Sequence, residues 1–276
     1  MSMSPQSQAG MAKRDKQFSN QQMRKYFTEK RYSRKMIVCA AVLGLISFLS
    51  LAFNGVFSIV GFFLCVCFVG YILIKARSIP TDKEYDEWVK RKRRALLSRA
   101  YKKLHLNQSH LIIHPLIVKG FILPGSEPAA HYSARDVYMK EGEDGQWRFS
   151  INVFMFFFAT EDYLAVFSSS VNAVNQSAPP VEGTEEYFYD HIVGVTTYTG
   201  QDVAVIYGQE YDYRIQKFSL RIANRDNINL GAYIGATALG NSQHGPIIIP
   251  PTMNIDRVLA ELRHVIRLKR KSPFGP

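Results

Sequence analysis

The sequence predicts a membrane-anchored α+β protein with three parts. These are an N-terminal transmembrane helical hairpin, an amphipathic juxtamembrane helix, and a seven-stranded β-rich barrel or sandwich that ends in a helix. Three observations lead to this prediction: residues 36–74 contain no charged side chain, the net charge of +11 is unevenly distributed, and short β-like runs follow residue 109.

The charge is positive on both sides of the uncharged run and negative in the middle of the chain. Residues 1–35 contain nine Lys or Arg against two Asp or Glu, and residues 75–104 contain eleven against four. Residues 105–253 contain only eight against fifteen. Because basic residues beside a membrane segment are explained by topology, the charge argues against nucleic acid as a partner.

Residues 36–75 are too long for one membrane pass and long enough for two. As a single helix the uncharged run would measure about 58 Å, whereas the hydrocarbon core is about 30 Å thick. Asn54-Gly55 is the strongest turn signal within it, so the sequence predicts a hairpin with its turn at 54–55. The flanking basic residues place both termini in the cytoplasm, as in a multi-pass protein of the bacterial inner (cytoplasmic) membrane. Residues 1–35 are then a basic, flexible cytoplasmic tail.

Residues 80–104 form the predicted amphipathic basic helix. Pro80 ends the preceding segment, and Thr81 and Glu84 have the spacing of a capping box. Acidic residues come early and basic residues late, which suits the helix dipole. The basic block is either a solvated face with a topology role or a surface that binds anionic lipid. The predicted membrane-surface residues are Trp88, Lys90, Arg91, Lys92, Arg93 and Arg94.

Residues 109–270 form the predicted cytoplasmic domain. Seven apolar, aromatic and β-branched runs alternate with turn residues, which is typical of a sandwich or barrel. Residues 254–270 place apolar side chains at helical spacing, so a C-terminal helix is expected to cover the sheet.

Four runs within this domain resemble a pleckstrin-homology-like domain of the kind found in bacterial membrane-anchored proteins: Ala159–Ser170, Glu186–Val195, Phe218–Leu230 and Asp256–Ile266. The resemblance implies a binding or scaffold module for lipids or proteins. Lipid-binding members usually expose a basic pocket between early strands. The first part of this acidic domain offers only Lys119, Arg135, Lys140 and Arg148, so a protein partner is favoured.

Candidate catalytic and metal patterns are weak. His110 and His114 lie on an extended segment, where they are too far apart to share an ion. Asp190 and His191 are adjacent on a predicted strand and therefore point to opposite faces, which is wrong for a catalytic pair. No catalytic residue, metal or cofactor is expected.

The predicted function is a non-catalytic inner-membrane scaffold or adaptor that recruits, assembles with or regulates a protein partner. The alternatives are a lipid-sensing or effector domain and an unrecognised enzyme. Ser177–Thr184 and Ile247–Met253 contain prolines and are candidate partner contacts. Small residues in the hairpin also permit a homo-oligomer.

Overall fold

The computed structural model describes residues 18–29, 78–206, 208–223, 230–239, 247–251 and 255–270, with seven single positions between 38 and 71. The chain divides into two compact units, Met1–Thr81 and Asp82–Pro276. The first unit contains helix α2 (Asn20–Thr28), which begins with a capping box. The Ser19 hydroxyl accepts from the Gln22 amide at 3.2 Å, and the Gln22 side chain accepts from the Ser19 amide at 3.0 Å.

The predicted membrane anchor is corrected. Among the residues that the structure describes, no helix is both long enough and apolar enough to cross a bilayer. A span needs about 20 apolar residues in one helix, and the described helices are short or strongly charged. The hairpin expected at 36–75 lies outside the described residues apart from single positions. The membrane-anchored fold class, the transmembrane assignment and the multi-pass inner-membrane localisation are therefore withdrawn.

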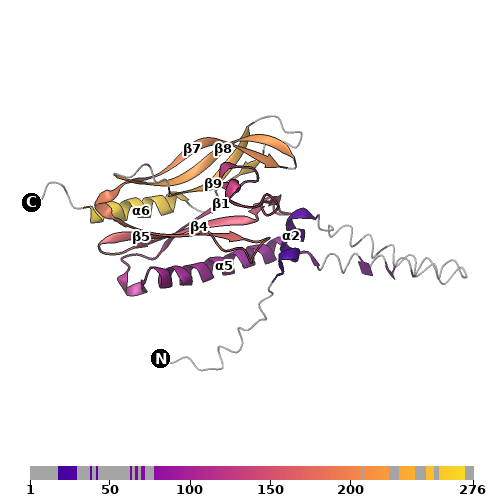
Figure 1. Cartoon of the computed structure of the whole chain (residues 1–276), viewed down its shortest axis with the longest axis horizontal. Helices are drawn as coiled ribbons and strands as arrows, with labels where there is room; N and C mark the ends of the chain where they lie inside the picture. The colour runs from indigo at the N-terminus through magenta and orange to yellow at the C-terminus, as the bar shows by residue number, and fades with distance from the viewer. Residues whose placement is uncertain are drawn as a thin grey trace, which may run out of the picture. The chain divides into compact units, whose positions relative to one another are not determined.

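The second unit is an α+β fold (Figure 1). Its helices are α5 (Asp82–Lys103) and α6 (Ile255–Lys269), and its short 3-10 helices are η1 (Gln108–His110), η2 (Glu127–His131) and η3 (Tyr189–His191). The strands are β1 (Leu116–Phe121), β2 (Met139–Glu141), β3 (Trp147–Phe149), β4 (Ile151–Ala159), β5 (Tyr163–Asn172), β6 (Glu182–Phe188), β7 (Ile192–Ile206), β8 (Gln209–Ile222), β9 (Leu230–Leu239) and β10 (Ile248–Ile249).

The strands form one large antiparallel sheet and one small one. The 8-stranded sheet has the order β6-β5-β4-β1-β9-β8-β7, with β10 paired to β9, while β2 and β3 form a separate hairpin. The large sheet curls around α6, and β6 and β7 are its two ends (Figure 1). The seven-stranded barrel or sandwich predicted from the sequence is therefore wrong: a helix fills the concave face, so no second sheet is needed there.

Strand β4 is the centre of the unit because both of its faces are buried. Met155 and Phe157 face the main core, which includes Leu259 and Leu262 of α6. Phe158 points the other way, and its ring lies 5.1 Å from the ring of Tyr101 in α5. A strand covered on both faces is apolar at consecutive positions, which explains the unbroken run at the end of β4. Helix α5 consequently lies on the outer face of β4 and β5, opposite α6 (Figure 1).

Candidate functional site

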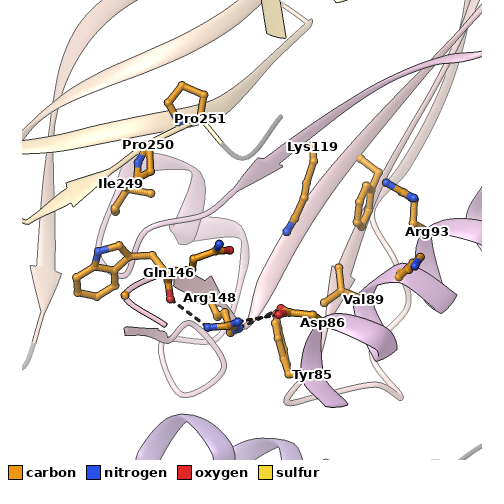
Figure 2. Close-up of a pocket in the computed structure, with 14 residues that line it drawn as sticks. Tyr85, Asp86, Val89, Arg93, Lys119, Gln146, Arg148, Ile249, Pro250 and Pro251 are labelled. Atoms are coloured by element: carbon orange, nitrogen blue, oxygen red, sulfur yellow. Dashed lines mark hydrogen bonds and ion pairs between the residues drawn. The ribbon is translucent and has the colours of Figure 1, made fainter. Parts of the chain in front are cut away.

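A cavity of about 570 Å³ opens between helix α5 and the sheet (Figure 2). Its walls come from α5, β1, β3, β4 and the segment that follows β10. The charged residues that line it are Asp86, Lys90, Arg93, Lys119 and Arg148. The larger apolar ones are Val89, Trp147, Phe154, Ile249, Pro250 and Pro251. Four cations and one carboxylate thus share a partly apolar cavity.

Arg148 in β3 is buried and held in place by carboxylates. Its side chain is only 4% exposed and donates to both carboxylate oxygens of Asp86, at 3.0 and 2.7 Å, and to both oxygens of Asp144, at 2.8 Å each. Asp82 adds a third carboxylate 3.7 Å away. These hydrogen bonds hold the pKa of Asp144 well below its usual range. The bidentate pair with Asp86 joins α5 to the β2–β3 hairpin, and the pair with Asp144 lies within that hairpin. Together they neutralise the Arg148 charge.

Tyr85, in the same turn of α5 as Asp86, is hydrogen-bonded to buried groups of the sheet. Its hydroxyl donates to the Phe149 carbonyl, and the Asn152 side-chain amide donates to the Tyr85 hydroxyl at 2.9 Å. Burial raises the pKa of Tyr85 well above its ordinary value, so the phenol remains protonated and neutral. The position of Asp86, the next residue in the helix, is therefore set by a buried network and by Arg148.

Lys119 enters the cavity from β1, and its amine points toward Arg148 and Asp86 in Figure 2. Burial lowers the pKa of this amine, and the charges of Arg93 and Arg148 lower it further, while Asp86 acts in the opposite direction. Within the described residues, neither Lys119 nor Arg93 forms an ion pair. The cavity therefore presents positive charge that the protein itself does not neutralise.

Two other cavities bring fewer cations together. One of about 610 Å³ runs from Pro124 to Ile206 and has no charged lining residue. The other, of about 620 Å³, lies between α5 and the Pro179-Pro180 loop and mixes Lys92 and Arg99 with Asp136. The cavity beside Lys119 combines several cations with an apolar wall, so it is the best candidate site.

The six residues predicted to bind a membrane surface do not form one face. Consecutive residues on a helix are about 100° apart, so a block of five surrounds the helix. Lys90 and Arg93 line the cavity, while Arg94 is exposed elsewhere. The Lys92 amine lies 5.5 Å from the Trp88 ring, and Trp88 is 3% exposed. Arg91 is half-buried. Lipid contact by these residues stays a prediction.

The residues considered for catalysis lie apart from the cavity. His110 lies in η1, where its Nδ1 accepts from the Asn107 amide at 3.4 Å, and His114 is exposed. Asp190 and His191 lie in η3 and not on the strand that the sequence predicts, and both are exposed. Within the described part of the chain, no group of three or more His, Cys, Asp or Glu residues is placed to hold a metal ion.

The sequence analysis names Lys119 and Arg148 among four basic residues in the first part of the domain. Four such residues do not predict a basic pocket there. The missing cations are Lys90 and Arg93, which belong to the helix that the sequence predicts as a separate juxtamembrane segment. Helix α5 instead belongs to the same compact unit as the sheet. The basic block at 90–94 was the sequence feature that pointed to this site. The sequence does not show that Lys119 and Arg148 lie near it in the folded protein.

Comparisons of the chain with protein families, with curated proteins and with solved structures find no match in any of the three. The resemblance to a pleckstrin-homology-like domain accordingly stays a prediction.

Proposed function

We propose that the unit beginning at Asp82 is a non-catalytic binding module that accepts an anionic group of its ligand in the cavity beside α5. The observation that carries this proposal is the pair of cations, Lys119 and Arg93, that face the cavity without an ion pair among the described residues. Charged donors from two different elements converge there, as in a site built for an anion.

The electrostatic setting favours selective binding of an anion at this place. The central segment, residues 105–253, is acidic, but helix α5 brings a block of basic residues beside it, and Lys90 and Arg93 of that block line the cavity. Charges of one sign gathered in a recess with apolar walls focus the field at one point. Both oxygens of Asp86 accept hydrogen bonds from Arg148. The charge of Asp86 acts on the Lys119 amine, but the two, both among the described residues, form no ion pair.

A binding role also fits the donor set better than a catalytic one. Among the described residues that line the cavity, the one carboxylate, Asp86, is held by Arg148, and the one phenol, Tyr85, is buried and protonated. Guanidinium groups can hold an anion but do not exchange protons near neutral pH, as acid-base catalysis requires. Lys119 differs from them, because burial lowers the pKa of its amine.

The test is isothermal titration of the full-length chain with inorganic phosphate at low ionic strength. Lys119→Met and Arg93→Met should each weaken binding at least about tenfold, since a hydrogen bond to a charged group contributes about 1.5–3 kcal/mol and about 1.4 kcal/mol is a factor of ten. Arg94→Met is the matched control: it removes the same charge from the same helix at an exposed position that does not line the cavity. Equal losses in all three variants, or none in the first two, would refute the proposal.

A further inference from the structure

The cationic side of the cavity carries more charge than a carboxylate would neutralise. The Arg148 charge is neutralised by Asp86 and Asp144. Lys90, Arg93 and Lys119 remain, and of these only Lys90 has an ion partner among the described residues, the exposed Glu87 at 3.8 Å. Near neutral pH a phosphate monoester carries about −1.5 to −2 charges and three strong acceptor oxygens. A carboxylate offers one charge and two oxygens.

The opposite side of the cavity is apolar. Figure 2 shows Ile249, Pro250 and Pro251 on one side and Arg93 on the other, with Lys119 between them. Trp147 also lines the cavity. Three residues of the segment that the sequence singled out as a candidate contact, Ile249, Pro250 and Pro251, thus supply a wall of the site. Proline rings and an indole offer flat apolar surfaces that an ion alone would leave without a partner.

The size of the cavity agrees with a ligand larger than a free ion. A volume of about 570 Å³ lies within the range of roughly 300–1,000 Å³ that is common for sites of small organic ligands. Inorganic phosphate alone would leave part of this volume unfilled, and Pro250, Pro251 and Trp147 also line it.

We infer that the ligand is a small phosphate monoester with a flat, apolar ester group. Its phosphate contacts Lys119, Arg93 and Lys90, and its ester group contacts Trp147, Pro250 and Pro251. This inference rests on the proposed function, because it specifies which anion the cavity takes. The two halves of the ligand are recognised by different elements of the protein, α5 and β1 for the phosphate and the β3 and post-β10 segments for the ester group.

The experiment compares three probes on the full-length chain: inorganic phosphate, phenyl phosphate and benzoate. The chain contains two tryptophans, so Trp88→Phe leaves Trp147 as the only tryptophan reporter, and it lines the cavity. Phenyl phosphate is expected to bind about tenfold more tightly than inorganic phosphate, because six further carbon atoms contact the apolar wall. Benzoate should bind about tenfold more weakly than phenyl phosphate, because it carries less charge.

Substitutions then separate the two halves of the site. Lys119→Met should weaken both phosphate ligands by a similar factor. Pro250→Ala combined with Pro251→Ala should reduce the ratio between phenyl phosphate and inorganic phosphate to about twofold or less. The ratio is independent of the fraction of folded protein, since both probes are measured on the same sample. Arg94→Met should change neither affinity.

The outcomes distinguish this inference from the proposed function. If inorganic phosphate binds and depends on Lys119, but phenyl phosphate binds no more tightly, the inference is wrong and the anion site stands. If benzoate binds as tightly as phenyl phosphate, the preference for a dianion is refuted. If no probe changes the Trp147 emission or releases heat, both proposals fail.

Discussion

Arg148→Met is the most informative single substitution for stability, because one buried guanidinium joins α5 to the β2–β3 hairpin. The side chain is 4% exposed and makes four hydrogen bonds to Asp86 and Asp144, all between 2.7 and 3.0 Å. Methionine has a similar length and no charge, so the substitution removes the pairs without leaving a large void. Three carboxylates, including Asp82, then lose their common partner.

The expected loss is about 3 kcal/mol of unfolding free energy. Breaking a buried ion pair by removing one partner costs about 3–5 kcal/mol. The lower end applies here because the side chains of Asp86 and Asp144 are 53% and 47% exposed, so water can hydrate them after the change. For a unit of this size, about 3 kcal/mol corresponds to a decrease in Tm of about 6–12 °C.

Thermal unfolding of the full-length chain, followed by circular dichroism and calorimetry, measures this loss. Arg148→Lys should lie between the wild type and the methionine variant, because an ammonium cannot replace a bidentate guanidinium. Arg94→Met, which removes an exposed charge from α5, should lie within about 0.5 kcal/mol of the wild type. A decrease in Tm below about 2 °C for Arg148→Met would refute the view that Arg148 fixes α5 to the sheet.

Three further predictions concern packing and pH. Leu262→Ala should destabilise the second unit by about 2–5 kcal/mol in urea unfolding, because Leu262 is fully buried against the sheet, whereas Leu268→Ala, 68% exposed on the same helix, should change it little. The pKa of Asp144 is depressed in the folded state, so its contribution to the free energy of unfolding is present above the unfolded pKa of about 3.9 and is lost as the pH falls through the folded value. In unfolding scans between pH 6 and 2, the stability of Asp144→Asn should therefore fall less steeply than that of the wild type. The affinity for phenyl phosphate should rise through the second pKa of a phosphate monoester, about 6, and fall again at alkaline pH, earlier than an ordinary lysine would give, because burial lowers the pKa of Lys119. A falling limb that persists in Lys119→Arg would contradict this assignment.

Helices were the part of the second unit that local patterns located well. The sequence predicts helices at 80–104 and 254–270, and the structure has α5 at Asp82–Lys103 and α6 at Ile255–Lys269. Their apolar spacing and the charge order of α5 are local properties, so no knowledge of the partner surface was needed.

Strands were located less accurately because their limits depend on the neighbouring strands. The run from Glu186 to Tyr198 looks like one strand, yet η3 at Tyr189–His191 divides it into the end of β6 and the start of β7. That turn lets the chain pass from one edge of the curled sheet to the other. Asp190 and His191 are therefore exposed in a turn, and the face argument made for a strand does not apply to them.

The membrane prediction failed for a different reason. A long uncharged run is necessary for a helical span, but composition alone does not show that a spanning helix forms. Once a span is assumed, the basic block of α5 looks like the charged flank of a membrane segment. Two of its residues, Lys90 and Arg93, instead line a cavity of the folded unit.

Local patterns in the chain are enough to predict a β-rich segment between two amphipathic helices, with positive charge concentrated outside an acidic centre. They do not predict which face of the sheet each helix covers, because both faces of β4 are apolar and either could accept a helix. The tertiary structure places α5 on the outer face, beside Lys119 of β1 and Arg148 of β3. The candidate site contains cations that are distant in sequence and close in the folded protein. Their spacing along the chain does not predict that closeness.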